Sequence, residues 1–283
     1  MKFRIALAQM DPVLGDMDRN IRTHLELVDR AESLGADLVV FPELSLTGYS
    51  VRDLNWDLAV SLTGNTSRLS PLTERSTSIP ILAGGIEEDE GFAIYNAALL
   101  FEQGRVRSVH RKTYPPTYGL FEEMRYFSRG TTVRAVDTTV GRLGVIICED
   151  LWHMSLPYLL AMQGAQLIIA LVASPTRMGG NEEMLQASII NTENQKAYAR
   201  LLSTYVVACN RVGYEDGVNF WGGSTVVAPG GEVVVSAKLF EPDLVVADID
   251  DNEVRRARRF SRHFLDDDPS LVLRELDRIV RKV

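Results

Sequence analysis

Residues 144–152 read GVIICEDLW. The β-branched apolar residues 145–147 predict the end of a buried strand, and the acidic pair after the cysteine marks the point where the chain turns. Active sites of α/β proteins usually lie at the carboxyl ends of buried strands. Cys148 is therefore a candidate nucleophile. A small buried structural residue is the alternative, and this window alone does not separate the two.

Strand and helix patterns alternate on both sides of this stretch. The chain opens with a strand over 3–10, a helix with apolar residues recurring from 21 to 34, and a strand over 37–41. Beyond Cys148 the pattern predicts a helix over 156–163, a strand over 167–173, a helix over 181–203 and a strand over 205–208. Further strands are predicted over 79–86, 94–102, 106–109, 220–228, 233–237 and 244–249. The sequence thus predicts one α/β domain with a mixed sheet, arranged as two packed sheets covered by helices.

Composition narrows the class of protein. The chain has 283 residues, of which 46% are hydrophobic, and a formal net charge of −8, which fits a folded globular protein and disfavours a nucleic-acid binder. Cys148 and Cys209 are the only cysteines, too few for a disulfide framework, so we expect a reducing compartment. The apolar residues at the N-terminus are interrupted too early for a signal peptide, and no stretch is long enough to span a membrane. These features predict a cytoplasmic protein that binds neither nucleic acid nor a membrane.

The last part of the chain has a different character. Five arginines between 255 and 262 precede three consecutive aspartates at 266–268, and an amphipathic pattern follows from 269 to 283. We interpret the arginines as one face of a solvated helix. We expect one domain over 1–250 and a charged, amphipathic tail over 251–283, which packs on the body or on a partner subunit.

A thiol nucleophile needs a base or a neighbouring cation. The four histidines offer only thin support for a Cys–His pair, although His153 is close in sequence. Glu43 follows a buried strand that Pro42 ends, because proline cannot donate to the sheet. Lys112 lies in an aromatic, proline-containing segment that predicts an ordered loop. Each residue alone is a weak candidate, since a loop glutamate and a surface lysine are common.

Several familiar motifs are absent from the sequence. It has no Walker loop, dinucleotide glycine fingerprint, G-x-S-x-G elbow, H-E-x-x-H or paired C-x-x-C pattern. We therefore expect neither a metal site nor a cofactor.

Three separated motifs, taken together, resemble the nitrilase, or carbon–nitrogen hydrolase, superfamily. They are FPELSLTGY around Glu43, RKTYPPTYGLFEEMRYF around Lys112 and GVIICEDLW around Cys148. The opening strand IALAQM, the strand YNAALLF and the stretch NRVG agree with the resemblance, which covers about residues 3–250. It implies a four-layer α-β-β-α sandwich with mixed sheets. It also implies that Glu43 is the general base, that Lys112 stabilises the oxyanion and that Cys148 is the nucleophile. A second glutamate that positions the lysine falls on Glu123.

Within this superfamily the sequence is most similar to the glutaminase domains of glutamine-dependent NAD synthetases. That likeness rests on residues 118–127 and on CEDLW, and it implies that Tyr118, Trp152 and Ser174 line the amide pocket. Glu149 is a candidate partner for a substrate ammonium group, and a structural salt bridge is an equal alternative. No Ser-Gly-Gly pyrophosphatase loop is present, so we expect that these residues do not make NAD alone.

These observations predict hydrolysis of a small carboxamide to a carboxylate and ammonia through a cysteine thioester. Glutamine is the first substrate to test. A nitrilase or an N-carbamoyl amino acid hydrolase is the alternative within the superfamily, and a non-catalytic regulatory subunit is the alternative from another class. The resemblance and the amphipathic tail also predict a homodimer or a larger homo-oligomer.

Overall fold

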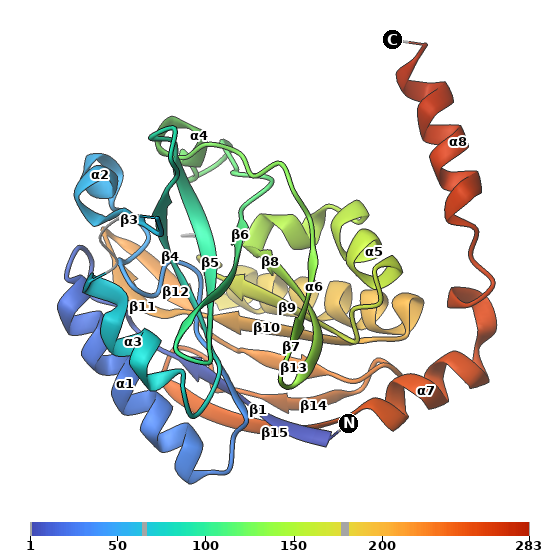
Figure 1. Ribbon diagram of the computed structural model, residues 1–283, viewed down its shortest axis with the longest axis horizontal. Helices are drawn as coiled ribbons and strands as arrows, with labels where there is room; N and C mark the ends of the chain where they lie inside the picture. Colours follow the sequence, from blue (N-terminus) through green and yellow to red (C-terminus); the bar gives the residue numbers. More distant parts are fainter. Residues whose placement is uncertain (1, 64–66, 177–180, 283) are drawn as a thin grey trace.

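Two β-sheets pack face to face in the computed structural model, which describes residues 2–63, 67–176 and 181–282 (Figure 1). The first sheet has the order β15 (Asp243–Asp250), β1 (Lys2–Gln9), β2 (Leu38–Val40), β4 (Ile81–Glu88), β5 (Ile94–Glu102) and β6 (Arg105–Arg111), with β3 (Val60–Ser61) pairing beside β4. The second has the order β14 (Val233–Ser236), β13 (Thr225–Val227), β10 (Tyr205–Asn210), β9 (Leu167–Val172), β8 (Gly141–Ile147) and β7 (Ala135–Thr138).

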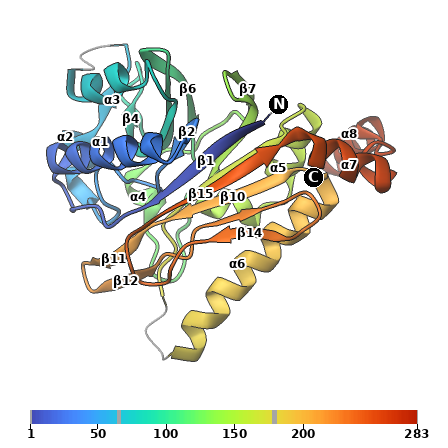
Figure 2. The ribbon, with the colours of Figure 1, turned by 90° about the horizontal axis from the view of Figure 1, so that it is seen from below.

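Helices cover the outer face of each sheet. The first sheet is covered by α1 (Met17–Ser33) and α3 (Ser70–Arg75), and the second by α5 (Ser155–Met162) and α6 (Asn181–Leu202). Figure 2 shows the layers from below, with α1 on one side and α6 on the other. The remaining elements are short or peripheral: α2 (Asn55–Leu58), α4 (Glu123–Tyr126), the ribbon of β11 (Val212–Glu215) and β12 (Val218–Trp221), and the 3-10 turns η1 (Arg52–Leu54), η2 (Ser67–Leu69), η3 (Cys148–Trp152) and η4 (Arg262–Phe264). The predicted α-β-β-α sandwich with mixed sheets is confirmed.

Side-chain alternation along the strands builds three separate apolar layers. In β1, Ile5 and Leu7 face the second sheet, whereas Ala6 and Ala8 pack under the helices of the first. The layer between the sheets draws residues from both of them, including Ile147. Because the central strands are buried on both faces, they read as nearly continuous apolar runs.

Parallel pairing directs several strand ends to one edge of the sandwich. Strands β8, β9 and β10 are mutually parallel, as are β1, β2 and β4. Strand β6 runs antiparallel to β5, which runs antiparallel to β4, so β6 has the direction of β2. The segments that follow β2, β6, β8 and β9 therefore emerge at corresponding ends of the two sheets, where sites commonly form in α/β folds.

One predicted strand is wrong in detail. Residues 220–228 form the end of β12 and all of β13, with Gly222 and Gly223 between them at φ of +73° and +60°. Residues with a Cβ rarely adopt this left-handed backbone conformation, whereas glycine does so readily. The glycine pair therefore turns the chain from the β11–β12 ribbon into the second sheet. The Gly-Gly pair is a turn signal in the sequence, and it marks this break.

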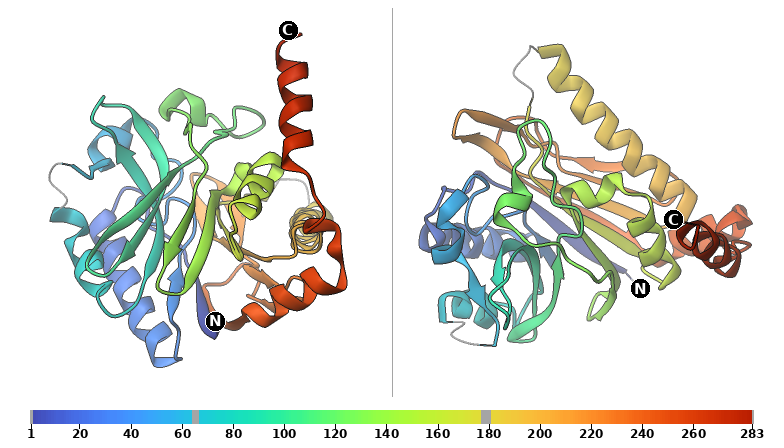
Figure 3. Two further views of the ribbon diagram at one scale, coloured as in Figure 1. Left: turned by 45° about the vertical axis from the view of Figure 1, so that its right-hand side comes forward. Right: turned by 90° about the horizontal axis from the view of Figure 1, so that it is seen from above.

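The tail leaves the body of the molecule. Helix α7 (Asp251–Phe260) buries Val254, whereas α8 (Pro269–Val280) buries none of its residues in the single chain. Figure 1 and Figure 3 show α8 standing away from both sheets. Among the described residues, no helix combines the length and the apolar character needed to span a membrane.

Candidate active site

Three of the predicted residues meet at this edge of the sandwich. Glu43 lies just beyond β2, Lys112 directly follows β6, and Cys148 directly follows β8. Glu43 and Lys112 are almost completely buried, with 1% of each residue exposed. Their position is fixed by backbone contacts: Lys112 N–H donates to the carbonyl of Asn96 over 2.8 Å, and Gly84 lies so close to the Glu43 segment that a Cβ there would come within 2.3 Å of the Leu44 nitrogen.

Lys112 lies between two carboxylates. Its Nζ donates to Glu43 Oε1 and to Glu123 Oε1, each over 2.7 Å. Burial opposes the charged form of Lys112, but Glu123 and Glu43 outweigh that effect and raise its pKa well above the usual value. Burial raises the pKa of Glu123 to about 7, against the favourable charge of Lys112. Of the pair 122–123, Glu123 is the residue that begins α4 and contacts Lys112, and its role in positioning the lysine stays a prediction.

Cys148 has a strained backbone and a neutral thiol. Its φ of +45° lies in the left-handed region, which is costly for a residue with a Cβ and is often found at active sites. Burial raises the pKa of the thiol well above its usual value, and Glu43 raises it further, whereas Lys112 and the Ala173 N–H lower it. The thiol is thus protonated at rest and needs a base when it attacks.

Three supporting groups around this cluster were not predicted from the sequence. Asn96 Nδ2 donates to Glu43 Oε1 over 2.8 Å, and Ala173 N–H donates to Glu43 Oε2 over 2.9 Å. Tyr49 OH donates to Glu123 Oε1 over 2.5 Å. Asn96 is a polar residue that interrupts an apolar stretch of strand 94–102, and that position was the available signal for its role. Ala173 acts through its backbone, which carries no signal in side-chain chemistry.

Asp150 ties the cysteine turn to the lysine segment. Its Oδ1 accepts the backbone N–H groups of Thr113 and Tyr114 over 3.1 and 2.9 Å. Its Oδ2 accepts the N–H of Ile147 over 3.1 Å and lies 2.9 Å from His110 Nε2. Asp150 is fully buried, so this one carboxylate bridges the residues on either side of the reacting groups. The sequence around Asp150 predicted only a turn at this position.

The predicted substrate residues divide into two sets. A cavity of about 30 Å³ beside Cys148 is lined by Trp152, Ser174, Trp221 and the polar α6 residues Asn191 and Gln195. Ser174 Oγ accepts the indole N–H of Trp221 over 3.0 Å. Tyr118 and Glu149 lie outside this lining and bond to each other, the phenol donating to Glu149 Oε2 over 2.8 Å. The closed part of this cavity has room for only a few waters.

The histidines and the second cysteine have other environments. His24 is buried between Asn20, Ser45 and Phe41, which lowers its pKa to about 4 through burial. His110 pairs with Asp150, His153 stacks on Tyr114, and His263 contacts backbone carbonyls near the end of α6. Cys209 is fully buried, and its thiol donates to the Val40 carbonyl over 3.3 Å. The Cys–His alternative therefore has no support in the geometry of the four rings.

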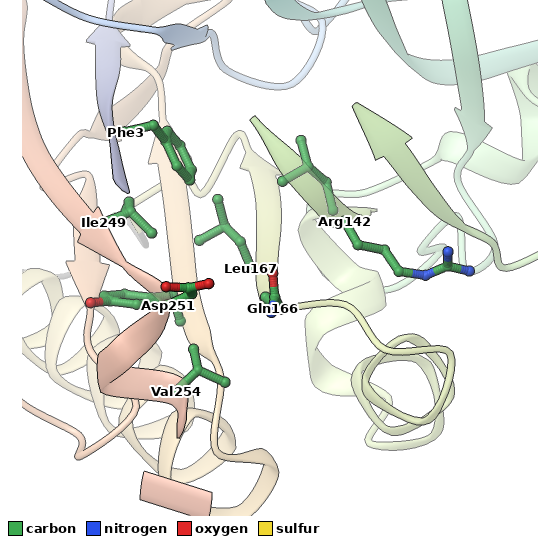
Figure 4. Close-up of a pocket in the computed structure, with 9 residues that line it drawn as sticks. Phe3, Arg142, Gln166, Leu167, Ile249, Asp251 and Val254 are labelled. Atoms are coloured by element: carbon green, nitrogen blue, oxygen red, sulfur yellow. The ribbon is translucent and has the colours of Figure 1, made fainter. Parts of the chain in front are cut away.

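A second cavity lies at the opposite ends of the same strands. Figure 4 shows it between Phe3, Leu167, Ile249 and Val254, where β1, β9, β15 and α7 approach one another. Its volume is about 10 Å³, room for roughly one water. Its lining is mainly apolar, and it is a gap in the core. Among the described residues, no group of three or more His, Cys, Asp or Glu side chains is arranged to hold a metal ion.

Comparison with known families agrees with this geometry. The family model described as carbon-nitrogen hydrolase matches residues 4–259, which is most of the chain. The chain belongs to the carbon–nitrogen hydrolase family. The match extends past the predicted boundary at residue 250 and includes nearly all of α7.

Three similar proteins place the chain within the carbon–nitrogen hydrolases. A glutamine-dependent NAD(+) synthetase from Thermotoga maritima is 38% identical over 259 residues, which are 89% of this chain and 43% of that protein. A carbon-nitrogen hydrolase from Helicobacter pylori G27 has a TM-score of 0.88 at 25% identity and covers 98% of both chains. A mutant amidase from Nesterenkonia sp. AN1 carries a covalent acetamide moiety on its active-site cysteine, with a TM-score of 0.76, 25% identity and 96% of each chain covered. The chain spans less than half the length of the curated relatives it matches.

Proposed function

We propose that this protein hydrolyses a small carboxamide to a carboxylate and ammonia through a thioester on Cys148. The observation that carries the proposal is the buried Lys112 held between Glu43 and Glu123, beside a cysteine at the end of β8. A carboxylate base, a fixed cation and a protonated thiol are the parts that acyl transfer to sulfur requires.

In the first half of the reaction Glu43 takes the thiol proton while Cys148 Sγ bonds to the amide carbon. The oxygen that becomes negative is stabilised by Lys112, with a backbone N–H beside Cys148 as the second donor. Glu43 then returns the proton to the amide nitrogen, the C–N bond breaks and ammonia leaves. In the second half Glu43 deprotonates a water that attacks the thioester carbon, and the proton passes to the departing thiolate. Glu123 touches Lys112 and keeps its charge in place.

Two relatives support this reaction class. The Nesterenkonia amidase holds an acetamide moiety covalently on its active-site cysteine, which corresponds to the role proposed for Cys148. The Thermotoga relative is named for its dependence on glutamine. We therefore propose a glutamine-type amide as the substrate.

The Tyr118–Glu149 pair supports a substrate with an ammonium group. Glu149 lies directly after the nucleophile, and burial together with its bond to Glu149 raises the pKa of Tyr118 to about 12. Such a phenol stays protonated and leaves the carboxylate charge available to a cation. If glutamine binds here, Glu149→Gln should raise KM for glutamine more than KM for a neutral amide of the same length. Equal changes in both constants would remove Glu149 from substrate recognition.

The deciding experiment is an ammonia-release screen over primary amides, nitriles and N-carbamoyl amino acids, without ATP, with Cys148→Ala as the blank. Amide turnover that is absent in the variant supports the proposal. Faster turnover of nitriles or carbamoyl compounds would assign one of the other family reactions. An inactive wild-type protein that still folds would favour the regulatory subunit.

The tail bears on the oligomeric state of the protein, and the cysteines bear on its compartment. We propose that the tail over 251–283 follows a catalytic domain and contributes to a homodimer or larger homo-oligomer, because α8 exposes Leu271, Leu273, Leu276, Ile279 and Val280. Light scattering that gives one monomeric mass at all concentrations would refute this assembly.

Both cysteines are free thiols, which fits a reducing compartment and a cytoplasmic location.

A further inference from the structure

The hydroxyl of Tyr49 is a further hydrogen-bond donor to the charged cluster. It donates to Glu123 Oε1 over 2.5 Å, and the same oxygen accepts Lys112 Nζ over 2.7 Å. Tyr49 belongs to the loop that also carries Glu43, six residues earlier in the chain. A shift of this loop would therefore move the base and the support of Lys112 together.

The backbone at Tyr49 is held by a buried carboxylate from the β11–β12 ribbon. Glu215 Oε1 accepts the N–H of Tyr49 over 2.9 Å and the N–H of Ser50 over 2.6 Å. Gly48 makes this approach possible: its φ is +81°, and a Cβ at this position would lie 2.8 Å from Glu215 Oε2. Glu215 is 5% exposed, so its carboxylate is shielded from water and bonds to this loop and to one cation.

That cation is Arg211, the largest of the fully buried side chains. Its Nη1 donates to Glu215 Oε2 over 2.6 Å, and its guanidinium lies 4.2 Å from the centre of the Phe220 ring. The Phe220 ring in turn packs against Tyr49, with 5.9 Å between ring centres. A buried carboxylate without such a partner would be strongly destabilising. The ribbon thus fixes Tyr49 by its backbone and by its ring.

We propose that Tyr49 is a positioning residue for amide hydrolysis, and that the buried Arg211–Glu215 pair holds its hydroxyl against Glu123 so that Glu123 stays paired with Lys112. This inference rests on the proposed function, since it concerns the same reaction. We refer to Arg211, Glu215 and the backbone of residues 48–50 as the latch.

The chemical consequence follows from the charges around Glu123. Burial and Glu43 favour its protonated form, whereas Lys112 and the Tyr49 hydroxyl favour the carboxylate. Loss of the Tyr49 bond removes one of the stabilising groups, so Glu123 is protonated at a higher pH. Lys112 then pairs with Glu43 alone, which leaves the base less free to accept the thiol proton. The effect is largest at low pH, where Glu123 is protonated most readily.

The test is Tyr49→Phe, which keeps the ring and its contacts with Phe121 and Phe220. Tyr95→Phe is the matched control, because Tyr95 OH also donates to a carboxylate, Asp89 Oδ2 over 3.0 Å, outside the site. For Tyr49→Phe we expect kcat on the best amide to fall about tenfold at pH 7, with little change in KM, since a hydrogen bond to a charged group commonly contributes that much. The acid limb of the kcat profile should move up by about one pH unit.

A measurement that needs no substrate separates this inference from the proposed function. The pH profile for alkylation of Cys148 by iodoacetamide, followed from mildly acidic to alkaline pH, should change in Tyr49→Phe and stay unchanged in Tyr95→Phe, because the charge of Glu123 acts on the thiol. Unchanged pH profiles for both turnover and alkylation in Tyr49→Phe would overturn the inference, while wild-type amide turnover would leave the proposed function intact. Absence of wild-type turnover would refute the proposed function alone.

A double-variant comparison tests the latch. Glu215→Gln should lower kcat in the same direction as Tyr49→Phe, and the double variant should be no slower than the slower single variant, because both act through one hydroxyl. Multiplied losses in the double variant would show that Glu215 acts by another route. Thermal unfolding of each variant identifies the fraction that is folded at the assay temperature.

Discussion

The two ends of the sandwich share strands β8 and β9, but the side chains that meet at each end differ in chemistry. At the carboxyl ends of β8 and β9, Glu43, Lys112 and Glu123 are held out of water beside a cysteine with positive φ. At the other ends the gap is lined mainly by apolar side chains such as Phe3 and Leu167 (Figure 4). Only the first of these two ends combines buried, paired charges with a cysteine at positive φ, and the gap at the other end is ordinary apolar packing.

The charged end also has an internal imbalance. One cation is paired with two carboxylates, so the three side chains carry an excess negative charge when all are ionised. That excess, with burial, accounts for the raised pKa of Glu123 and for the protonated thiol of Cys148. The cluster is therefore poised to accept a proton, which is what the proposed first step needs.

The largest expected effect is loss of the nucleophile at the charged end. Cys148→Ala should abolish ammonia release, since the thioester cannot form, and should leave the unfolding temperature near that of the wild type. Cys209→Ala is the matched control, because Cys209 is the other free thiol and lies fully buried within β10. It should lose stability and keep turnover. Wild-type turnover in Cys148→Ala would remove this residue from the mechanism.

The sequence predicted the charged residues and the cysteine better than the residues that hold them in place. Glu43, Lys112 and Cys148 each follow a strand whose pattern is clear, and their motifs are separated but ordered. Tyr49, Asn96 and Asp150 stood inside those motifs or strands, yet their roles depend on contacts across as many as 74 residues of sequence, as between Tyr49 and Glu123. Patterns of period 2 or 3.6 describe local faces and cannot specify such pairings. The break at Gly222 and Gly223 is different, because a Gly-Gly pair is a local turn signal; the apolar residues on both sides nevertheless favoured one continuous strand.

The second effect in size concerns the cation and the base. Lys112→Met and Glu43→Gln should each lower turnover by at least about a hundredfold, the usual consequence of losing an oxyanion donor or a general base. Lys112→Met also leaves Glu43 and Glu123 buried without a cation, so its unfolding temperature should fall more than that of Glu43→Gln. Calorimetry together with ammonia release measures both quantities. Retention of more than a tenth of the activity in Lys112→Met would contradict the assigned role.

The third effect is a dependence on pH that arises at the charged end. Because the pKa of Glu123 is raised to about 7, kcat should fall below pH 7 by about tenfold per unit as this carboxylate becomes protonated and releases Lys112. The free energy of unfolding changes with pH in the opposite direction to kcat. Between pH 4.5, the ordinary pKa of a glutamate, and about pH 7, Glu123 binds more protons in the folded than in the unfolded chain. Ionising it therefore lowers the free energy of unfolding. In Glu123→Gln turnover should be low at every pH and this acid limb should disappear; an unchanged limb would assign it to another group.

The smallest effect on turnover, and the sharpest test of the contrast, comes from two leucines of one strand. Leu167 and Leu171 lie on the same face of β9 in the layer between the sheets, and each is at most 1% exposed. Leu167 borders the apolar cavity, whereas Leu171 pairs with Ile147, the residue before Cys148.

Each change to alanine should lower the free energy of unfolding by about 3 kcal/mol, as large-to-small changes in a core do. Assayed well below the unfolding temperature, Leu167→Ala should keep kcat within about twofold, because a cavity at the far end does not reach the charged cluster. Leu171→Ala should lower kcat about tenfold, because a shift of roughly an ångström in a catalytic group is costly. Equal losses of kcat in the two variants would show that the apolar end controls the geometry of the site as strongly as the charged end does.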